Sequence, residues 1–190
     1  PPHHAVPQKV YDQKVGLTRQ HLALFSPAVS MQDDRWYAAQ LLSLILGDGS
    51  GSRYFWSLVD PAVADSASLE LASMDAVGAF CSYICCDPEN VHHVEDILNS
   101  IFNDVTTKGI CPEELESARN KAISSVALKS ERPMGRLVNL GFNWVYRKEY
   151  ISVVQDIEYL KAVSIQHVED ILHQYNVRNY TLYSLGPAPK

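Results

Sequence analysis

The stretch of sequence that decides the fold runs from residue 30 to residue 60 and reads SMQDDRWYAAQLLSLILGDGSGSRYFWSLVD. Ser30 and Asp33 have the spacing of a capping box, so we predict a helix that begins near Met31. Apolar residues occupy almost every position from Trp36 to Leu46, which leaves no face that prefers water. The predicted helix, about 16 residues long, is too short to span a membrane. We therefore expect it to be a buried core helix.

A loop rich in glycine and serine follows this helix, and Gly47 is expected to adopt a positive φ and end the helix. The loop comprises Gly47, Asp48, Gly49, Ser50, Gly51, Ser52 and Arg53. Such a loop is either a plain connector or a binding segment, and binding segments are often loops carried on a rigid scaffold. We take these residues as candidate substrate-binding residues.

The composition excludes several classes of protein. The chain has 190 residues, of which 46% are hydrophobic and 20% charged, and this is typical of a soluble globular domain. A formal charge of -6 argues against nucleic acid or an anionic membrane as a partner, because both require a basic surface. We expect residues 8–190 to form a single domain after a linker at residues 1–7. The sequence does not identify the compartment.

Known catalytic and metal-binding motifs are not satisfied. A serine nucleophile elbow requires GxSxG between a strand and a helix. Ser50 has glycine directly on either side of it instead, and its loop follows a helix. A calcium loop starting at Asp48 requires glycine and glutamate where Arg53 and Val59 stand. Neither HExxH nor HxxEH occurs, so no metal ligands are assigned. The adjacent cysteines 85 and 86 have no base nearby in the sequence, and we interpret them as packing residues in a reduced state.

The remaining sequence predicts an α+β fold, with helices packed on one face of a largely antiparallel sheet. Strands are expected at residues 8–17, 20–25, 66–72, 77–86 and 180–185, with Pro27 ending the second strand. Helices are expected at residues 53–59, 88–108, 112–126, 134–146, 152–160 and 164–175. The strands at 66–72 and 77–86 are predicted to form a hairpin.

Five segments in the same order resemble the pitrilysin/insulinase family of zinc metallopeptidases. They are LGDGSGSRYF at 46–55, CPEELESARNKAISSV at 111–126, ERPMGRLVNLGFNWVYRKEY at 131–150, YLKAVSIQHVEDILHQY at 159–175 and NYTLYSLGP at 179–187. Each segment alone is degenerate, but together they cover nearly the whole chain.

The resemblance implies a role within a larger protein. Members of the family are built from paired domains that close over an unfolded peptide substrate. The first domain carries HxxEH and a distal glutamate that bind Zn²⁺, and the second contributes substrate contacts. This chain resembles the second, C-terminal type, so Zn²⁺ is expected in an HxxEH-bearing partner domain, in the same polypeptide or in a separate subunit. The alternative is a non-enzymatic assembly or scaffold subunit derived from the family.

One departure from the family pattern concerns catalysis. In active members an arginine and, seven residues later, a tyrosine stabilise the oxyanion formed on the peptide carbonyl. The corresponding positions here are Val59 and Ser66. Either the pair is lost, which points to a non-catalytic half, or another donor such as Arg53 or Tyr54 replaces it.

Overall fold

A computed structural model describes residues 6–188, and these contain one mixed five-stranded sheet in the order β1-β5-β2-β4-β3. The strands are β1 (Lys9–Lys14), β2 (Gln20–Ala28), β3 (Ser66–Ser73), β4 (Gly78–Cys86) and β5 (Thr181–Pro187). Strands β1 and β5 are parallel, and the other neighbouring pairs are antiparallel. The predicted largely antiparallel sheet, with its hairpin between β3 and β4, is confirmed.

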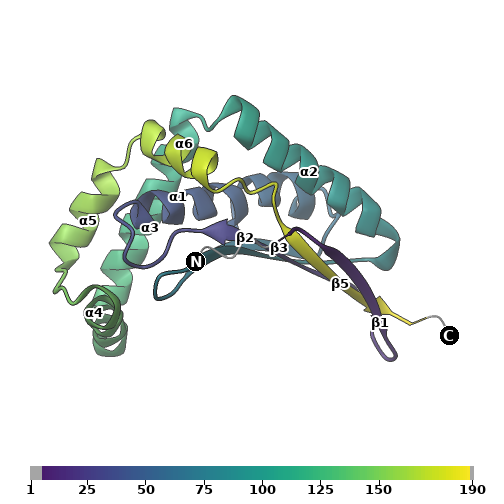
Figure 1. The fold of residues 1–190 in the computed structure, drawn as a ribbon, viewed down its shortest axis with the longest axis horizontal. Helices are drawn as coiled ribbons and strands as arrows, with labels where there is room; N and C mark the ends of the chain where they lie inside the picture. The colour runs from purple at the N-terminus through teal and green to yellow at the C-terminus, as the bar shows by residue number, and fades with distance from the viewer. Residues whose placement is uncertain (1–5, 189–190) are drawn as a thin grey trace.

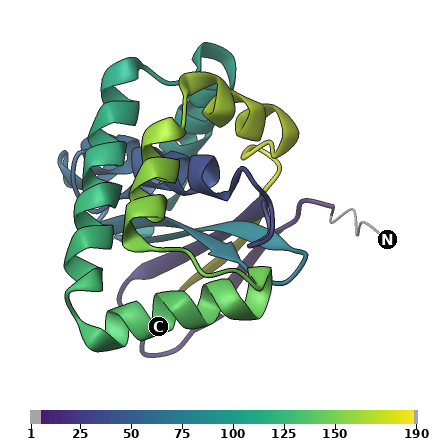
Figure 2. The same ribbon diagram turned by 90° about the vertical axis from the view of Figure 1, so that its left-hand side faces the viewer.

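The helices gather on one face of the sheet (Figure 1). They are α1 (Trp36–Gly47), η1 (Phe55–Val59), η2 (Pro88–Asn90), α2 (Val91–Lys108), α3 (Pro112–Ser130), α4 (Pro133–Arg147), α5 (Val153–Ala162) and α6 (Ile165–Gln174). Figure 2 shows α4 at one end of the molecule, running across the direction of α3 and α5. Within residues 6–188, no helix is both long and apolar enough to cross a membrane.

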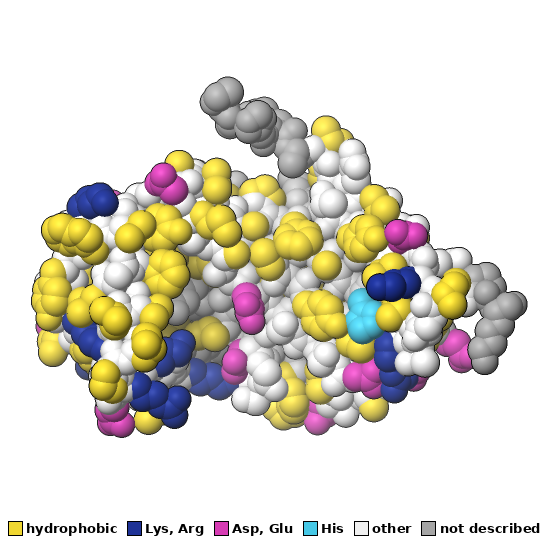
Figure 3. Space-filling model, turned by 90° about the horizontal axis from the view of Figure 1, so that it is seen from below, with side chains coloured by type: hydrophobic (Ala, Val, Ile, Leu, Met, Phe, Trp, Pro, Cys, Tyr) yellow, Lys and Arg dark blue, Asp and Glu magenta, His cyan; other side chains and the backbone are white. Residues whose placement is uncertain are grey.

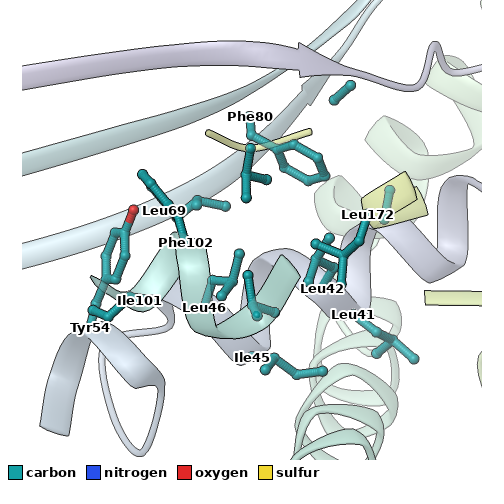
Figure 4. Packing of buried hydrophobic residues seen from close by; sticks show 14 of the residues in the cluster. Leu41, Leu42, Ile45, Leu46, Tyr54, Leu69, Phe80, Ile101, Phe102 and Leu172 are labelled. Atoms are coloured by element: carbon teal, nitrogen blue, oxygen red, sulfur yellow. The ribbon is translucent and has the colours of Figure 1, made fainter. Parts of the chain in front are cut away.

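Helix α1 is the centre of the core, as its sequence predicts. Nine of its 12 residues are buried, because the sheet covers one side and α3, α5 and α6 pack around the rest. Leu42 and Leu46 lie on the side of α1 that faces Leu69 and Phe80 of the sheet, and Leu41 lies on the side away from it (Figure 4). A fully buried leucine contributes about 2 kcal/mol of hydrophobic free energy. The other helices therefore cannot leave α1 without exposing a large apolar surface.

The predicted start of α1 is wrong. The helix begins at Trp36 rather than near Met31, and no side chain caps its first turn. The Asp33 carboxylate instead accepts hydrogen bonds from the backbone and the guanidinium of Arg35. These bonds, with the turn that joins Asp33 N–H to the Ser30 carbonyl, hold the preceding residues outside the helix.

Gly47 does not have the positive φ that we expected, and it is the last residue of α1. It is required for a different reason, because a Cβ on Gly47 would lie 2.2 Å from the backbone nitrogen of Leu69. The positive φ in this loop belongs to Gly51, at +68°. Glycine therefore allows α1 and β3 to approach closely, and the chain turns afterwards.

Pro27 does not end β2, which continues to Ala28. Pro27 pairs with Ala79 of β4, but β2 pairs with β5 only as far as Phe25. Pro27 thus has a neighbouring strand on one side alone, an edge-like position in which strands tolerate proline.

The remaining helix predictions are confirmed to within a few residues. Helix α2 buries a stripe of apolar residues that includes Val94, Leu98 and Val105, and it ends just before Gly109, whose φ is +74°. Helix α3 starts after Cys111 and buries its small residues Ala118 and Ala122. Of the linker predicted at residues 1–7, residues 1–5 lie outside the described residues.

Replacing Gly47 with alanine is expected to destabilise the fold, because the new Cβ has no space against β3. The free energy of unfolding should fall by about 1–3 kcal/mol, as for other overpacked core sites. Urea denaturation followed by circular dichroism measures the change. Gly49→Ala is the matched control, since nothing lies within 4 Å of a Cβ built there. Equal stability of the two variants would contradict this account of Gly47.

Candidate functional site

The glycine-serine loop predicted as a substrate-binding segment lies between α1 and η1, and its base is fixed to α3. Lys121 of α3 donates a hydrogen bond to the Asp48 carboxylate at 2.6 Å and also contacts the Ser50 carbonyl. The Ser52 hydroxyl donates to the Asp48 carbonyl at 2.6 Å and accepts from the Phe55 N–H. The polar groups of Asp48 and Ser52 are thus used within the protein.

Arg53 is also committed to structure. Its guanidinium donates two hydrogen bonds to Glu114 at 2.7 and 2.9 Å and one to the Gly109 carbonyl at 3.0 Å. Burial alone would raise the pKa of Glu114, but hydrogen bonds from Arg53 and from the Cys111 N–H outweigh it. The pKa of Glu114 is therefore lower than its ordinary value. Of the predicted site residues, Gly49, Ser50 and Gly51 remain exposed, and we call these three the loop tip.

The family resemblance places a catalytic arginine and tyrosine at the positions of Val59 and Ser66, and neither residue type stands there. Val59 ends η1 and packs half-buried against the hydrophobic core. Ser66 is exposed at the start of β3, opposite Cys85. Tyr54, which we considered as a substitute donor, is fully buried with its hydroxyl 2.8 Å from that of Ser82. Arg53, the other substitute, is paired with Glu114.

Cys86 has the packing role that we assigned, whereas Cys85 is only half-buried and its thiol lies 3.8 Å from the Asp65 carboxylate. Cys86 is fully buried, and burial raises the pKa of its thiol to about 11. Burial also raises the pKa of Cys85, which lies on the other face of β4. Neither thiol is activated as a nucleophile. Among residues 6–188, no cluster of three or more His, Cys, Asp or Glu side chains could hold a metal ion, so these residues do not fit a zinc site.

A cavity of about 700 Å³, which we did not predict from the sequence, lies at the end of α1 opposite the glycine-serine loop. We call it the α4 groove, and its walls include Trp36, Leu71, Val126, Arg136, Asn139 and Phe142. Figure 3 looks into the molecule from below and shows a hollow with Lys and Arg side chains along its border. The groove is missed from sequence because its walls come from α1, β3, α3, α4 and α5.

A hydrogen-bonded network forms part of the α4 groove. The Tyr37 hydroxyl donates to Asp156 at 2.6 Å, and the Asn139 amide donates to the same carboxylate at 3.0 Å. Asn143 in turn donates to Asn139 at 2.9 Å. Burial and the bond to Asp156 raise the pKa of Tyr37, so its hydroxyl stays protonated. The network holds one side of α4 against α1 and α5.

Four cations line the α4 groove: Lys129, Arg132, Arg136 and Arg147. Among residues 6–188, none of them forms an ion pair with a carboxylate. Two buried donors that line the groove, Trp36 Nε1 and Arg136 Nη1, have no hydrogen-bond partner among these residues. Unpaired buried donors are costly. The groove is thus chemically suited to an acceptor, above all a carboxylate, accompanied by apolar groups.

The Arg53–Glu114 pair gives a pH-dependent test of how the loop is held. Glu114→Gln should lower the free energy of unfolding at pH 7 by about 1–2 kcal/mol, since it weakens charged hydrogen bonds. The pKa of Glu114 is lowered in the folded state, so its stabilisation is present above the unfolded pKa of about 4.3 and is lost as the pH falls through the folded value.

Urea denaturation at a series of pH values between 7 and 3 measures this difference, which should disappear at the acidic end. Glu113→Gln is the matched control, because Glu113 lies in the same helical turn but is exposed. A difference that is independent of pH would contradict the role of the Glu114 charge.

Comparison with known proteins gives a family for this fold. The family described as the peptidase M16 inactive domain matches residues 1–122. An uncharacterized zinc protease of Streptomyces coelicolor is 24% identical over 168 residues, which are 88% of this chain and 37% of that protein. The chain thus spans less than half the length of this relative.

Solved structures show the same fold. A protease from Helicobacter pylori superimposes with a TM-score of 0.84 at 15% identity, covering 98% of this chain and 46% of that one. The inactive peptidase domain of a putative zinc protease from Bordetella parapertussis gives 0.78 at 17% identity, covering 91% and 95%. The fold, the ordered motifs and the family match together show that this chain belongs to the peptidase M16 inactive domain family, the non-zinc-binding C-terminal type of the pitrilysin/insulinase class.

Proposed function

We propose that this chain is the non-catalytic half of a zinc metallopeptidase that hydrolyses unfolded peptides together with an HxxEH-bearing half. The single observation that carries the proposal is the match to an inactive peptidase domain over residues 1–122. The zinc-protease relative, of which the chain spans 37%, leaves ample length for a metal-binding half. We treat residues 8–190 as one domain of that protein.

In this proposal the chemistry belongs to the partner and the peptide contact is shared. Zinc bound in the partner would supply an activated water for hydrolysis. Here, the loop tip contributes backbone N–H and carbonyl groups that suit an extended peptide of varied sequence. Support comes from its position, because Lys121 and Arg53 fix the base of the loop while Gly49, Ser50 and Gly51 stay exposed. A binding loop on a rigid base keeps its contact groups in place.

A bulky side chain on the loop tip tests the peptide contact. In the complete peptidase, Ser50→Tyr should raise KM for an unstructured fluorogenic peptide about tenfold and leave kcat within about threefold, since it obstructs binding rather than chemistry. Val15→Tyr is the control, because Val15 is 86% exposed in the turn between β1 and β2. An unchanged KM for Ser50→Tyr would contradict the contact.

Metal analysis tests whether zinc is bound by the HxxEH-bearing half alone. The purified chain should bind zinc well below one ion per molecule and should cleave no unstructured peptide, since its side chains offer no metal site within residues 6–188. Inductively coupled plasma mass spectrometry after dialysis measures the metal. One tightly bound zinc per chain would overturn the assignment. If the natural protein has no HxxEH-bearing half, the scaffold alternative replaces the enzymatic one.

A further inference from the structure

Helix α4 packs against the protein with its polar side. Asn143 is its one fully buried residue among those described, and Asn139 and Arg147 lie on the same side of the helix. Six apolar side chains on the remaining surface are 47–68% exposed, and we call this set the α4 apolar face. It consists of Met134, Leu137, Val138, Phe142, Trp144 and Val145.

This orientation is the reverse of the usual one. An amphipathic helix on a globular protein normally turns its apolar side to the core and its polar side to water. Here the polar side is held by the Tyr37–Asp156–Asn139 network, so α4 cannot rotate its apolar residues inward without breaking those bonds. Contiguous apolar surface of this kind marks an interaction site.

The α4 groove adjoins this face and is positively charged, so a partner that covers both must carry negative charge. Within residues 6–188 none of its four cations forms an ion pair, and these cations stand out on a chain with a net charge of -6. Trp36 Nε1 and Arg136 Nη1 have no hydrogen-bond partner within residues 6–188, so they can donate to acceptors that a partner brings. A complementary partner therefore carries apolar side chains and at least one carboxylate.

We propose that the α4 apolar face and the α4 groove form the docking surface for the metal-binding half of the peptidase. That half covers the apolar face with apolar side chains and places an acidic side chain in the groove. The inference rests on the proposed function and adds to it the surface that joins the two halves.

Two other occupants fit the charges less well. A symmetric contact with a second copy would bring the same four cations together from both molecules, which is unfavourable. The second alternative is a membrane surface. A helix that binds a membrane surface keeps its polar side exposed to water and lipid headgroups. The polar side of α4 is instead packed against α5 and the segment before α1, because Asn139 donates to Asp156 and Arg147 donates to the Met31 and Asp33 carbonyls.

Hydroxyl-radical footprinting with mass spectrometry tests the docking surface without mutation. It compares the chain alone with the natural assembly that contains the HxxEH-bearing half. Trp144 and Trp56 are matched probes, because they are 59% and 62% exposed and lie on α4 and η1. In the assembly, oxidation of Trp144 should fall about tenfold, since an interface core excludes water. Oxidation of Trp56 should stay the same, which also shows that the chain alone is folded.

A pair of substitutions tests the same surface by association. Leu137→Asp with Val145→Asp should weaken binding of the HxxEH-bearing half about 100-fold, as expected for hot-spot positions. Both side chains are more than 60% exposed, so the fold should be unaffected, and circular dichroism verifies this. Val15→Asp, at a still more exposed position outside the surface, should leave binding unchanged.

The outcomes separate this inference from the proposed function. Zinc-dependent peptide hydrolysis with Trp144 still reactive overturns the docking surface and leaves the function standing. Protection of Trp144 without hydrolysis supports the docking surface and overturns the function. Protection in a dimer of the chain alone, or on anionic phospholipid vesicles but not in the assembly, overturns the docking surface. If the natural protein has no HxxEH-bearing half, both are overturned.

Discussion

The rest of the structure depends on the close approach of helix α1 to strand β3. A residue other than glycine at position 47 would place its Cβ 2.2 Å from the backbone nitrogen of Leu69, so glycine is needed for the helix to lie this near to the sheet. The apolar surface of α1 then requires cover on its other sides, and α3, α5 and α6 provide it. Close packing of this kind allows little movement of one element without the others.

Helix α1 also places the two candidate surfaces. Its carboxyl end leads into the loop tip, and its amino end contributes Trp36 and Tyr37 to the α4 groove. Twelve residues of α-helix are about 18 Å long. The peptide contact and the docking surface that we propose therefore lie at opposite ends of one rigid element. Docking of the metal-binding half at one end would leave the loop tip free at the other.

The residues around the glycine-serine loop maintain the fold of this domain. Val59, the position at which the family resemblance implies an arginine, packs against the core. Arg53 and Lys121 hold the loop to α3, although their charges would also suit a peptide carbonyl. These two cationic side chains serve the fold, and the loop tip offers its backbone groups and the Ser50 hydroxyl.

Local patterns in the sequence determined the helices and strands, because each depends on residues within a few positions. The alternation along β4, the stripe on α2 and the start signal at Cys111–Pro112 are examples. The start of α1 was mispredicted because Asp33 bonds to Arg35 rather than to a helical N–H group, and local spacing does not distinguish the two.

Long-range contacts decided how the strands pair and how the helices are oriented. The parallel pairing of β1 with β5 joins opposite ends of the chain, and no short pattern specifies it. Sequence predicted helix α4 but not its orientation, which follows from the bonds of Asn139 to Asp156 on another helix. The α4 groove is formed in the same way, by residues that only packing brings together. The sequence therefore determined which elements form, and tertiary structure alone decided which of their faces remain open, since burial depends on distant neighbours.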